Sequence, residues 1–157
     1  MDDILRKYPR LAHGHFAVTS PATRKYNCVA WAAGDDRHWW APDIAAWWPE
    51  AGPEEWSVSG IISVYEMMGY AADPNPAPEA GIEKIAIFAL PDGYPTHVAR
   101  QVESGYWTSK LGTDVDIEHE LHGLTGTRFG GVVMIMSRSQ RGDVSPTLAL
   151  RFRSGGV

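Results

Sequence analysis

The chain has 157 residues, 44% of them hydrophobic, and a formal net charge of −5. That length suits a single domain, and the acidic balance argues against nucleic acid and anionic membrane surfaces as partners, because both attract basic clusters. The single cysteine excludes an internal disulfide framework and a cysteine-rich zinc site.

The N-terminus reads MDDILRKYPR, which opens acidic and lacks the apolar core of a signal peptide. No apolar run approaches the roughly 20 residues that span a bilayer. We therefore expect a cytoplasmic protein. Residues 1–26 predict an irregular arm with one helical turn at Asp3–Tyr8.

Two helices are predicted in the first half of the chain. The first begins at Cys28, with Asn27 as its N-cap, because Asn suits that cap and the segment is rich in alanine. Residues 35–55 are rich in Trp and Pro and predict an ordered surface loop. Apolar residues then recur at helical spacing over residues 56–68, which predicts the second helix.

The second half has the period of strands. Lys84–Leu90 is a strong strand candidate, and residues 97–103 and 106–112 predict a hairpin. A short helix near Ile117–Leu124 and a strand at Gly131–Ser137 follow. Helices first and antiparallel strands after them predict an α+β, papain-like fold, with N-terminal helices packed on a small antiparallel sheet.

No repeat and no domain boundary is evident. We expect one domain over residues 1–157, with its core at about 8–137. The polar, mixed composition of residues 138–157 is typical of a loosely held tail.

Cys28 is the candidate nucleophile. A thiol attacks as the thiolate, and unpaired backbone N–H groups at the start of a helix favour that charged form. The same N–H groups can hold the oxyanion of an acyl-transfer intermediate. The alternative is that Cys28 is a small apolar side chain packed in an alanine-rich helix, which is common for a free cysteine.

His97 is the best-placed base among the six histidines. It opens a predicted strand directly after a proline turn, and a strand start in a packed sheet keeps an imidazole aimed. His13 and His15 lie in the predicted arm and His38 in the Trp-rich loop, so they are weaker candidates. The alternative is that His97 only braces the end of its strand.

The residue that orients this imidazole depends on the register of the hairpin. A two-residue loop puts Thr108 and Lys110 on the face of His97, whereas a three-residue loop puts Ser109 there. We favour Ser109. Two acidic residues just beyond the hairpin are further options, namely Asp114 and Asp116.

A metal site is not predicted. His119 and His122 are spaced i, i+3 rather than the i, i+4 of a zinc-protease helix, and no third ligand is evident. We expect His119 to pack against the sheet through its helix, and we expect no metal and no cofactor.

Four strings resemble a family of small uncharacterised bacterial proteins. The likeness runs from about Tyr8 to Ser137, and it implies no particular activity. In chain order, the strings are FAVTSPATRKYNCVAWAAGD, THVARQ, YWTSKLG and IEHELHGLTGTRFGGV.

A second likeness is to papain-like amidases and peptidases of the NlpC and CHAP kinds. Those families place a cysteine at a helix N-terminus, a histidine at the opening of a strand and a polar residue on the next strand. Cys28, His97 and Ser109 occupy those places in that order. The sequence departs from the pattern in having Ser at the third place and a Trp-rich insertion between the first two.

The leading hypothesis is therefore a thiol-dependent hydrolase or acyltransferase acting on an amide or ester in a small molecule, peptide or protein. Cys28 is the nucleophile, His97 the base and acid, and Ser109 the orienting residue, while Trp107 and Lys110 contact the substrate. The alternative is a non-catalytic binding module that holds a partner in a Trp-rich cleft. A toxin-like effector domain would use the same chemistry. The leading hypothesis requires the thiol and the imidazole to meet.

Overall fold

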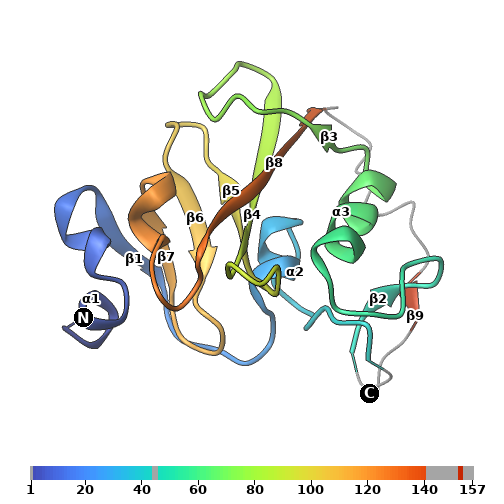
Figure 1. The fold of residues 1–157 in the computed structure, drawn as a ribbon, viewed down its shortest axis with the longest axis horizontal. Helices are drawn as coiled ribbons and strands as arrows, with labels where there is room; N and C mark the ends of the chain where they lie inside the picture. The colour runs from blue at the N-terminus through green and yellow to red at the C-terminus, as the bar shows by residue number, and fades with distance from the viewer. Residues whose placement is uncertain (1, 44–45, 141–151, 154–157) are drawn as a thin grey trace.

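The structure is a computed structural model that describes residues 2–43, 46–140 and 152–153. Within these ranges the centre is a seven-stranded antiparallel sheet in the order β1-β7-β6-β5-β4-β8-β3 (Figure 1). Strands β2 and β9 pair separately. The strands are β1 Phe16–Ser20, β2 Trp48–Pro49, β3 Ala71–Ala72, β4 Ile82–Ala89, β5 Pro95–Gln101, β6 Trp107–Lys110, β7 Asp116–His119, β8 Gly131–Ser139 and β9 Phe152–Arg153.

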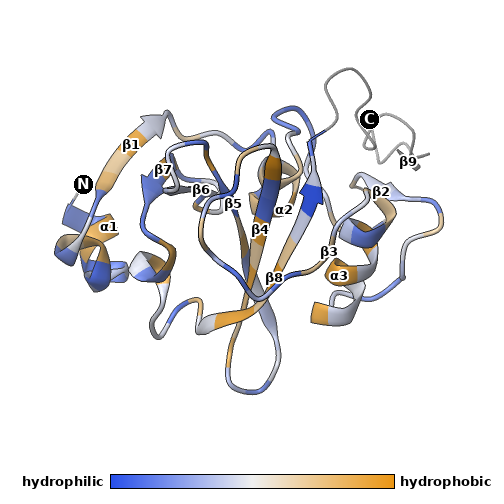
Figure 2. Cartoon of the chain, turned by 90° about the horizontal axis from the view of Figure 1, so that it is seen from above, coloured by the Kyte–Doolittle hydropathy of each residue, from blue (hydrophilic) through white to orange (hydrophobic). Residues whose placement is uncertain are grey.

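Helical segments lie at both ends of this sheet, and α2 packs against the central strands β5 and β6. Figure 2 shows α1 and β1 at one end of the molecule and α3 at the other. No helix in the described ranges is long and apolar enough to cross a membrane. The α-helices are α1 Asp2–Lys7, α2 Cys28–Ala32 and α3 Val58–Met67, and the 3-10 helices are η1 Pro9–His13 and η2 Leu121–Leu124.

Side-chain caps determine where α2 and α3 begin. The Asn27 side-chain oxygen accepts a hydrogen bond from the backbone N–H of Ala30 at 3.1 Å, and Ser57 Oγ accepts one from Gly60 at 2.9 Å. Each cap satisfies an N–H group that has no partner inside its helix. Gly69, with φ +92°, ends α3 because that left-handed conformation suits glycine.

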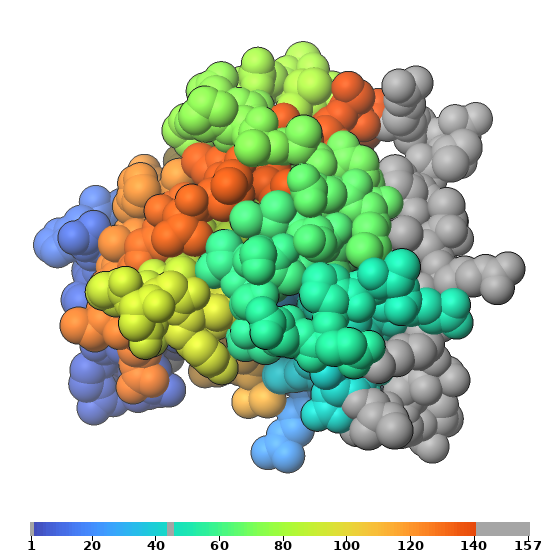
Figure 3. Space-filling view, turned by 45° about the vertical axis from the view of Figure 1, so that its right-hand side comes forward, coloured from blue at the N-terminus to red at the C-terminus, as the bar shows by residue number. Residues whose placement is uncertain are grey.

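Alternation along β4 divides the core into two clusters on opposite faces of the sheet. The helix cluster lies under α2 and α3 and includes Val29, Ala30, Trp40, Trp48, Ile61, Val64, Tyr65, Ile85, Ile87 and Val98. The arm cluster lies under α1, η1 and η2 and comprises Ile4, Leu11, Ala86, Phe88, Ala99, Trp107, Leu111, Ile117 and Leu124. Figure 3 shows α3 and its flanking segments covering much of one face.

Several predictions about the fold are confirmed. The chain is α+β, α2 begins at Cys28 behind Asn27, and α3 lies inside the predicted range. Strands β4, β5, β6 and β8 fall where strands were expected, within a few residues. The strong periodicity of these segments explains the agreement.

Two predictions about flanking segments are wrong. Part of the expected irregular arm is β1, which pairs with β7, and the predicted helix near Ile117–Leu124 starts instead as β7. Only Leu121–Leu124 is helical, as the 3-10 helix η2. The sheet is therefore larger than the small sheet expected.

Some residues of the predicted tail, 138–157, are strand residues in the described part of the chain. Arg138 and Ser139 end β8, and the Arg138 guanidinium donates to Glu83 Oε2 and to the Met68 carbonyl. Phe152–Arg153 forms β9 opposite β2. The rest of the predicted tail lies outside the described residues.

Candidate functional site

Three buried polar side chains from adjacent strands form one hydrogen-bonded chain. His97 Nε2 on β5 lies 2.7 Å from Ser109 Oγ on β6, and the same Oγ lies 2.7 Å from His119 Nε2 on β7. His119 Nδ1 lies 2.6 Å from the Glu120 carbonyl oxygen. The two histidines and the serine are at most 2% exposed. We call this arrangement the His–Ser–His chain.

Burial keeps both imidazoles neutral at pH 7. It lowers the pKa of His119 to about 4, although the bond to the Glu120 carbonyl acts in the opposite direction. Burial also lowers the pKa of His97 well below its ordinary value, and the nearby His119 adds to this effect. Phe129 stacks on the His97 ring, with 4.5 Å between centroids and 5° between planes.

The proton positions in the chain follow from the carbonyl at its end. A carbonyl oxygen only accepts, so His119 Nδ1 carries the proton and donates it to the Glu120 carbonyl. The neutral His119 Nε2 then accepts from the Ser109 hydroxyl, which in turn accepts from His97 Nε2–H. His97 Nδ1 is therefore left with a lone pair that can accept a proton.

The register of the β5–β6 hairpin produces the contact between His97 and Ser109. Gln101 lies opposite Trp107, and the Val102 N–H donates to the Tyr106 carbonyl at 2.8 Å. The loop therefore has three residues, and the predicted contact between His97 and Ser109 is present. Thr108 lies on the other face of the sheet, where it accepts a hydrogen bond from Trp31 Nε1 at 3.0 Å.

Cys28 is partly exposed at the start of α2. Its sulfur lies against the backbone N–H of Val98, the residue after His97, and against the N–H groups of Val29 and of Cys28 itself. Burial raises the pKa of the thiol, while these N–H groups and the charge of Lys110 act in the opposite direction. Because burial has the largest effect, the resting group is a protonated thiol at neutral pH.

Cys28 and His97 pack in different clusters. Cys28 contacts the helix cluster, whereas the His97 ring lies against Phe88 and Phe129 on the face of the arm cluster. Among the described residues no hydrogen bond joins the thiol to the imidazole. The β5–β6 ladder has its last pair at Arg100–Thr108, so His97 lies beyond its end. The structure thus brings His97 and Ser109 together, whereas the Cys28 sulfur contacts the N–H of Val98 and not the His97 ring.

Most of the chain matches a known family model. A family model for a domain of unknown function, DUF7689, matches residues 17–137. The chain belongs to the DUF7689 family. This agrees with the resemblance to an uncharacterised family. No curated protein and no solved structure matches the chain significantly, so these comparisons lend no support to the likeness to papain-like enzymes.

The two predicted substrate-contacting residues of this DUF7689 domain are buried. Trp107 is 2% exposed and packs in the arm cluster. Lys110 is fully buried, and its Nζ donates to the carbonyls of Gly112 at 2.6 Å and Asp114 at 2.5 Å. Neither side chain reaches the surface, so neither contacts a substrate in this conformation. Lys110 acts on the Cys28 thiol through its charge alone.

Neither acidic alternative to Ser109 contacts His97. Asp116 Oδ2 accepts a hydrogen bond from the Tyr26 hydroxyl at 2.6 Å, on the opposite face of the sheet. Asp114 uses its side chain to cap the N–H of Val115 at 2.8 Å. Both carboxylates therefore stabilise the turn and strand beyond the hairpin.

The Trp-rich segment supplies core residues. Trp40 and Trp48 are each 1% exposed and belong to the helix cluster. Their indole N–H groups donate to Asp35 Oδ2 at 2.8 Å and to the Pro53 carbonyl at 2.7 Å. Trp39 is exposed and Trp47 is partly buried. The predicted Trp-rich cleft would therefore lack two of its four indoles.

Metal-ligating side chains do not gather in the described part of the DUF7689 domain. Residues 2–43, 46–140 and 152–153 contain no group of three or more His, Cys, Asp or Glu that could hold a metal ion. His122 is exposed, with its Nδ1 3.3 Å from Thr125 Oγ1.

The hydrogen bond of His119 to Ser109 was not predicted from the sequence. The helix expected around His119 is the strand β7, in which His119 lies opposite Trp107 and Ile117 lies opposite Ser109. Apolar and polar residues alternate over residues 115–118, which read Val-Asp-Ile-Glu, shortly after the turn at Gly112, and this period predicts a strand. That signal would have placed His119 on the face of Ser109.

Proposed function

We propose that this DUF7689 domain is a papain-like thiol-dependent hydrolase or acyltransferase that acts on an amide or ester. The observation that supports it best is the His–Ser–His chain, whose first member, His97, directly precedes the residue whose N–H contacts the Cys28 sulfur. A buried polar chain costs stability relative to apolar residues, so its presence in a core calls for a role. Here it fixes Nε2 of His97 and leaves Nδ1 as the proton acceptor, one residue away from the peptide N–H that Cys28 contacts.

The reaction uses two groups. His97 Nδ1 takes the proton from Cys28 Sγ as the sulfur bonds to the carbonyl carbon of the substrate. The C–N or C–O bond then breaks, and the leaving amine or alcohol receives the proton back from Nδ1. Water then loses a proton to the same nitrogen and attacks the acyl carbon, the C–S bond breaks, and the sulfur takes the proton back from Nδ1. An alcohol or amine in place of water gives acyl transfer.

Backbone N–H groups support the transition state in this proposal. The N–H groups of Cys28, Val29 and Val98 already surround the sulfur. An oxyanion that forms on the attacked carbonyl develops beside that sulfur, within reach of the same donors. The charge of Lys110 acts in the same direction.

The proposal requires the thiol to approach the imidazole. In the resting state burial raises the pKa of Cys28 and lowers that of His97, so both groups are neutral. Because Cys28 and His97 lie on opposite faces of the sheet, Sγ reaches Nδ1 only if the part of β5 beyond the end of the β5–β6 ladder moves together with the Cys28 side chain. A neutral thiol and a neutral imidazole are compatible with general-base catalysis, in which His97 takes the thiol proton only as the sulfur attacks the substrate.

Alkylation with iodoacetamide tests the proposal. We expect Cys28 of the folded wild-type protein to react at pH 7 without prior unfolding, and we expect His97→Asn to slow the reaction by about 100-fold, the smaller end of typical general-base effects. Ser109→Ala should slow the reaction less, because it removes the hydrogen bond to the His97 ring but leaves the ring itself in place. Turnover of p-nitrophenyl acetate, followed at 400 nm or thereabouts, should be lost in Cys28→Ala.

His122→Asn is the matched control, because His122 is exposed and outside the His–Ser–His chain. It should react as the wild type does. The proposal fails if Cys28 reacts only after unfolding in urea, or if His97→Asn and wild type react at the same rate. Either result would favour the alternative, a non-catalytic binding module.

A further inference from the structure

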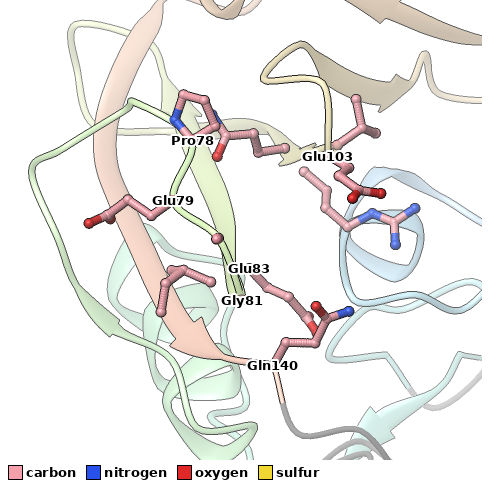
Figure 4. Close-up of a pocket in the computed structure, with 11 residues that line it drawn as sticks. Pro78, Glu79, Gly81, Glu83, Glu103 and Gln140 are labelled. Atoms are coloured by element: carbon pink, nitrogen blue, oxygen red, sulfur yellow. The ribbon is translucent and has the colours of Figure 1, made fainter.

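A pocket distant in sequence from Cys28 lies where β4 begins and where β5 and β8 end. Its volume is about 700 Å³. Figure 4 shows Pro78 and Glu79 on one side of it and Glu103 on another. The lining residues include Glu79, Glu83, Arg100, Gln101, Glu103 and Gln140. Neither Cys28 nor His97 lines it.

Two of the three glutamates in this pocket already have cationic partners. Glu83 Oε2 accepts from the Arg138 guanidinium at 2.9 Å and 3.1 Å. Glu79 Oε2 lies 2.6 Å from Lys84 Nζ. The pocket therefore holds less free negative charge than its composition indicates.

Arg100 differs from those paired charges. Its Nε is buried and has no hydrogen-bond partner in the described chain. The contact that the structure gives its guanidinium is with the Trp31 ring, 5.3 Å from the centroid. Arginine stays charged at all ordinary pH values and offers five N–H donors, so a buried Nε–H without an acceptor is costly.

The surroundings hold this guanidinium ready for a planar anion. Trp31 supports it through a cation–π contact, and the indole is itself fixed by its hydrogen bond to Thr108. A supported guanidinium keeps the fork of N–H donors that binds a carboxylate with two parallel hydrogen bonds. Because Nε itself is buried, the guanidinium must shift toward the pocket for such an acceptor to satisfy the Nε–H.

We propose that this pocket binds the carboxylate group of a small molecule or peptide through Arg100. A carboxylate fits better than a phosphate, because the charge of Glu103, added to what remains of the paired charges of Glu79 and Glu83, repels a dianion more than a monoanion. The site is independent of the chemistry proposed for Cys28, since no residue is shared between them.

Nuclear magnetic resonance of the Arg100 Nε–Hε group tests the proposal. Sodium acetate and sodium phosphate are titrated separately into ¹⁵N-labelled protein at constant ionic strength, with sodium chloride making up the difference. We expect acetate to shift the Arg100 signal saturably and phosphate to shift it more weakly. Backbone signals of Gln101 and Glu103 should follow the same acetate curve.

Arg100→Lys keeps the charge and removes the fork, and it should weaken acetate binding at least about tenfold, as loss of a bidentate contact predicts. Its backbone spectrum reports whether it folds, and Arg128→Lys, an exposed arginine, is the matched control that should bind as wild type. The proposal is overturned if acetate acts no differently from chloride, if phosphate binds more tightly, or if folded Arg100→Lys binds as wild type. Cys28→Ala should bind acetate normally whether or not Cys28 is catalytic.

Discussion

Ser109 is the residue on which the buried polar chain depends, because its hydroxyl serves both imidazoles at once. It accepts from His97 Nε2–H and donates to His119 Nε2, each at 2.7 Å. A hydroxyl can do both, so the serine links the two rings while His119 carries its proton on Nδ1 and His97 carries its proton on Nε2. Placing serine between them lets both rings stay neutral in a low-dielectric environment.

The neutral state of His119 predicts a loss of stability in mild acid. Its native pKa of about 4 lies below the ordinary 6.5, so between these values the unfolded chain binds more protons than the folded one. The contribution is complete above about pH 6.5 and falls as the pH drops toward 4. At about 1.36 kcal/mol per pH unit, the gap corresponds to about 3 kcal/mol of unfolding free energy.

Urea unfolding at pH 7, 6, 5 and 4.5 measures this loss. His119→Gln is the matched comparison, because its amide oxygen can still accept from Ser109 but does not titrate. We expect the variant to be less stable at pH 7 and to lose less stability on acidification. The neighbouring pair His15 and Glu118, joined at 2.7 Å, is present in both proteins and cancels. Parallel pH curves for the two proteins would contradict the assignment.

At the scale of elements, the start of α2 depends on Asn27 more than a single cap implies. Its side-chain oxygen accepts from Ala30 at 3.1 Å and from Trp40 at 3.2 Å, and its amide donates to the Trp40 carbonyl at 2.6 Å. Asn27 thus fixes both the helix that begins at Cys28 and the segment that follows it. The residue is 6% exposed, so water replaces few of these bonds.

Asn27→Ala should therefore cost more than removal of an ordinary cap. We expect the free energy of unfolding, measured in urea, to fall by about 2 to 3 kcal/mol, because the substitution removes three hydrogen bonds and leaves their buried partners unsatisfied. Ser57→Ala is the matched control, because Ser57 caps α3 through one bond to Gly60 and should cost about 1 kcal/mol. Equal losses in the two variants would show that the bonds to Trp40 contribute nothing.

The elements predicted correctly are those whose local signals agree with one another. Val58–Met67 combines helical spacing with a serine cap and a terminal glycine, and β4 contains a continuous apolar run, Ile85 to Ala89, that is buried on both faces. β1 and β7 are short and partly polar, so their local strand signals are weak, and they are stabilised by pairing with each other. The site shows the same difference between strong and weak local signals. The contact of His97 with Ser109 could be predicted from the register of the hairpin, whereas the position of His119 could be predicted only if β7 was identified as a strand.

At the scale of the whole molecule, β4 and β5 connect two cores that would otherwise be separate. Ile87 and Val98 face the helix cluster, while Phe88 and Ala99, their neighbours in the chain, face the arm cluster. His97 belongs to this shared strand pair and lies on the face of the arm cluster, whereas Cys28, at the start of α2, packs against the opposite face. Movement of one group toward the other is therefore coupled to both cores.

This shared strand pair predicts that the two clusters unfold together. Ile87→Ala and Phe88→Ala remove fully buried side chains from opposite faces, and each should cost about 3 to 4 kcal/mol. Tryptophan fluorescence reports chiefly on the helix cluster, which holds Trp40 and Trp48, whereas far-ultraviolet circular dichroism reports on the sheet. Both probes should give one midpoint in each variant. Val133→Ala, half exposed on β8, should shift that midpoint little. If Phe88→Ala lowered the dichroism midpoint and left the fluorescence midpoint in place, the clusters would be independent, and the thiol and imidazole would belong to separately folding halves.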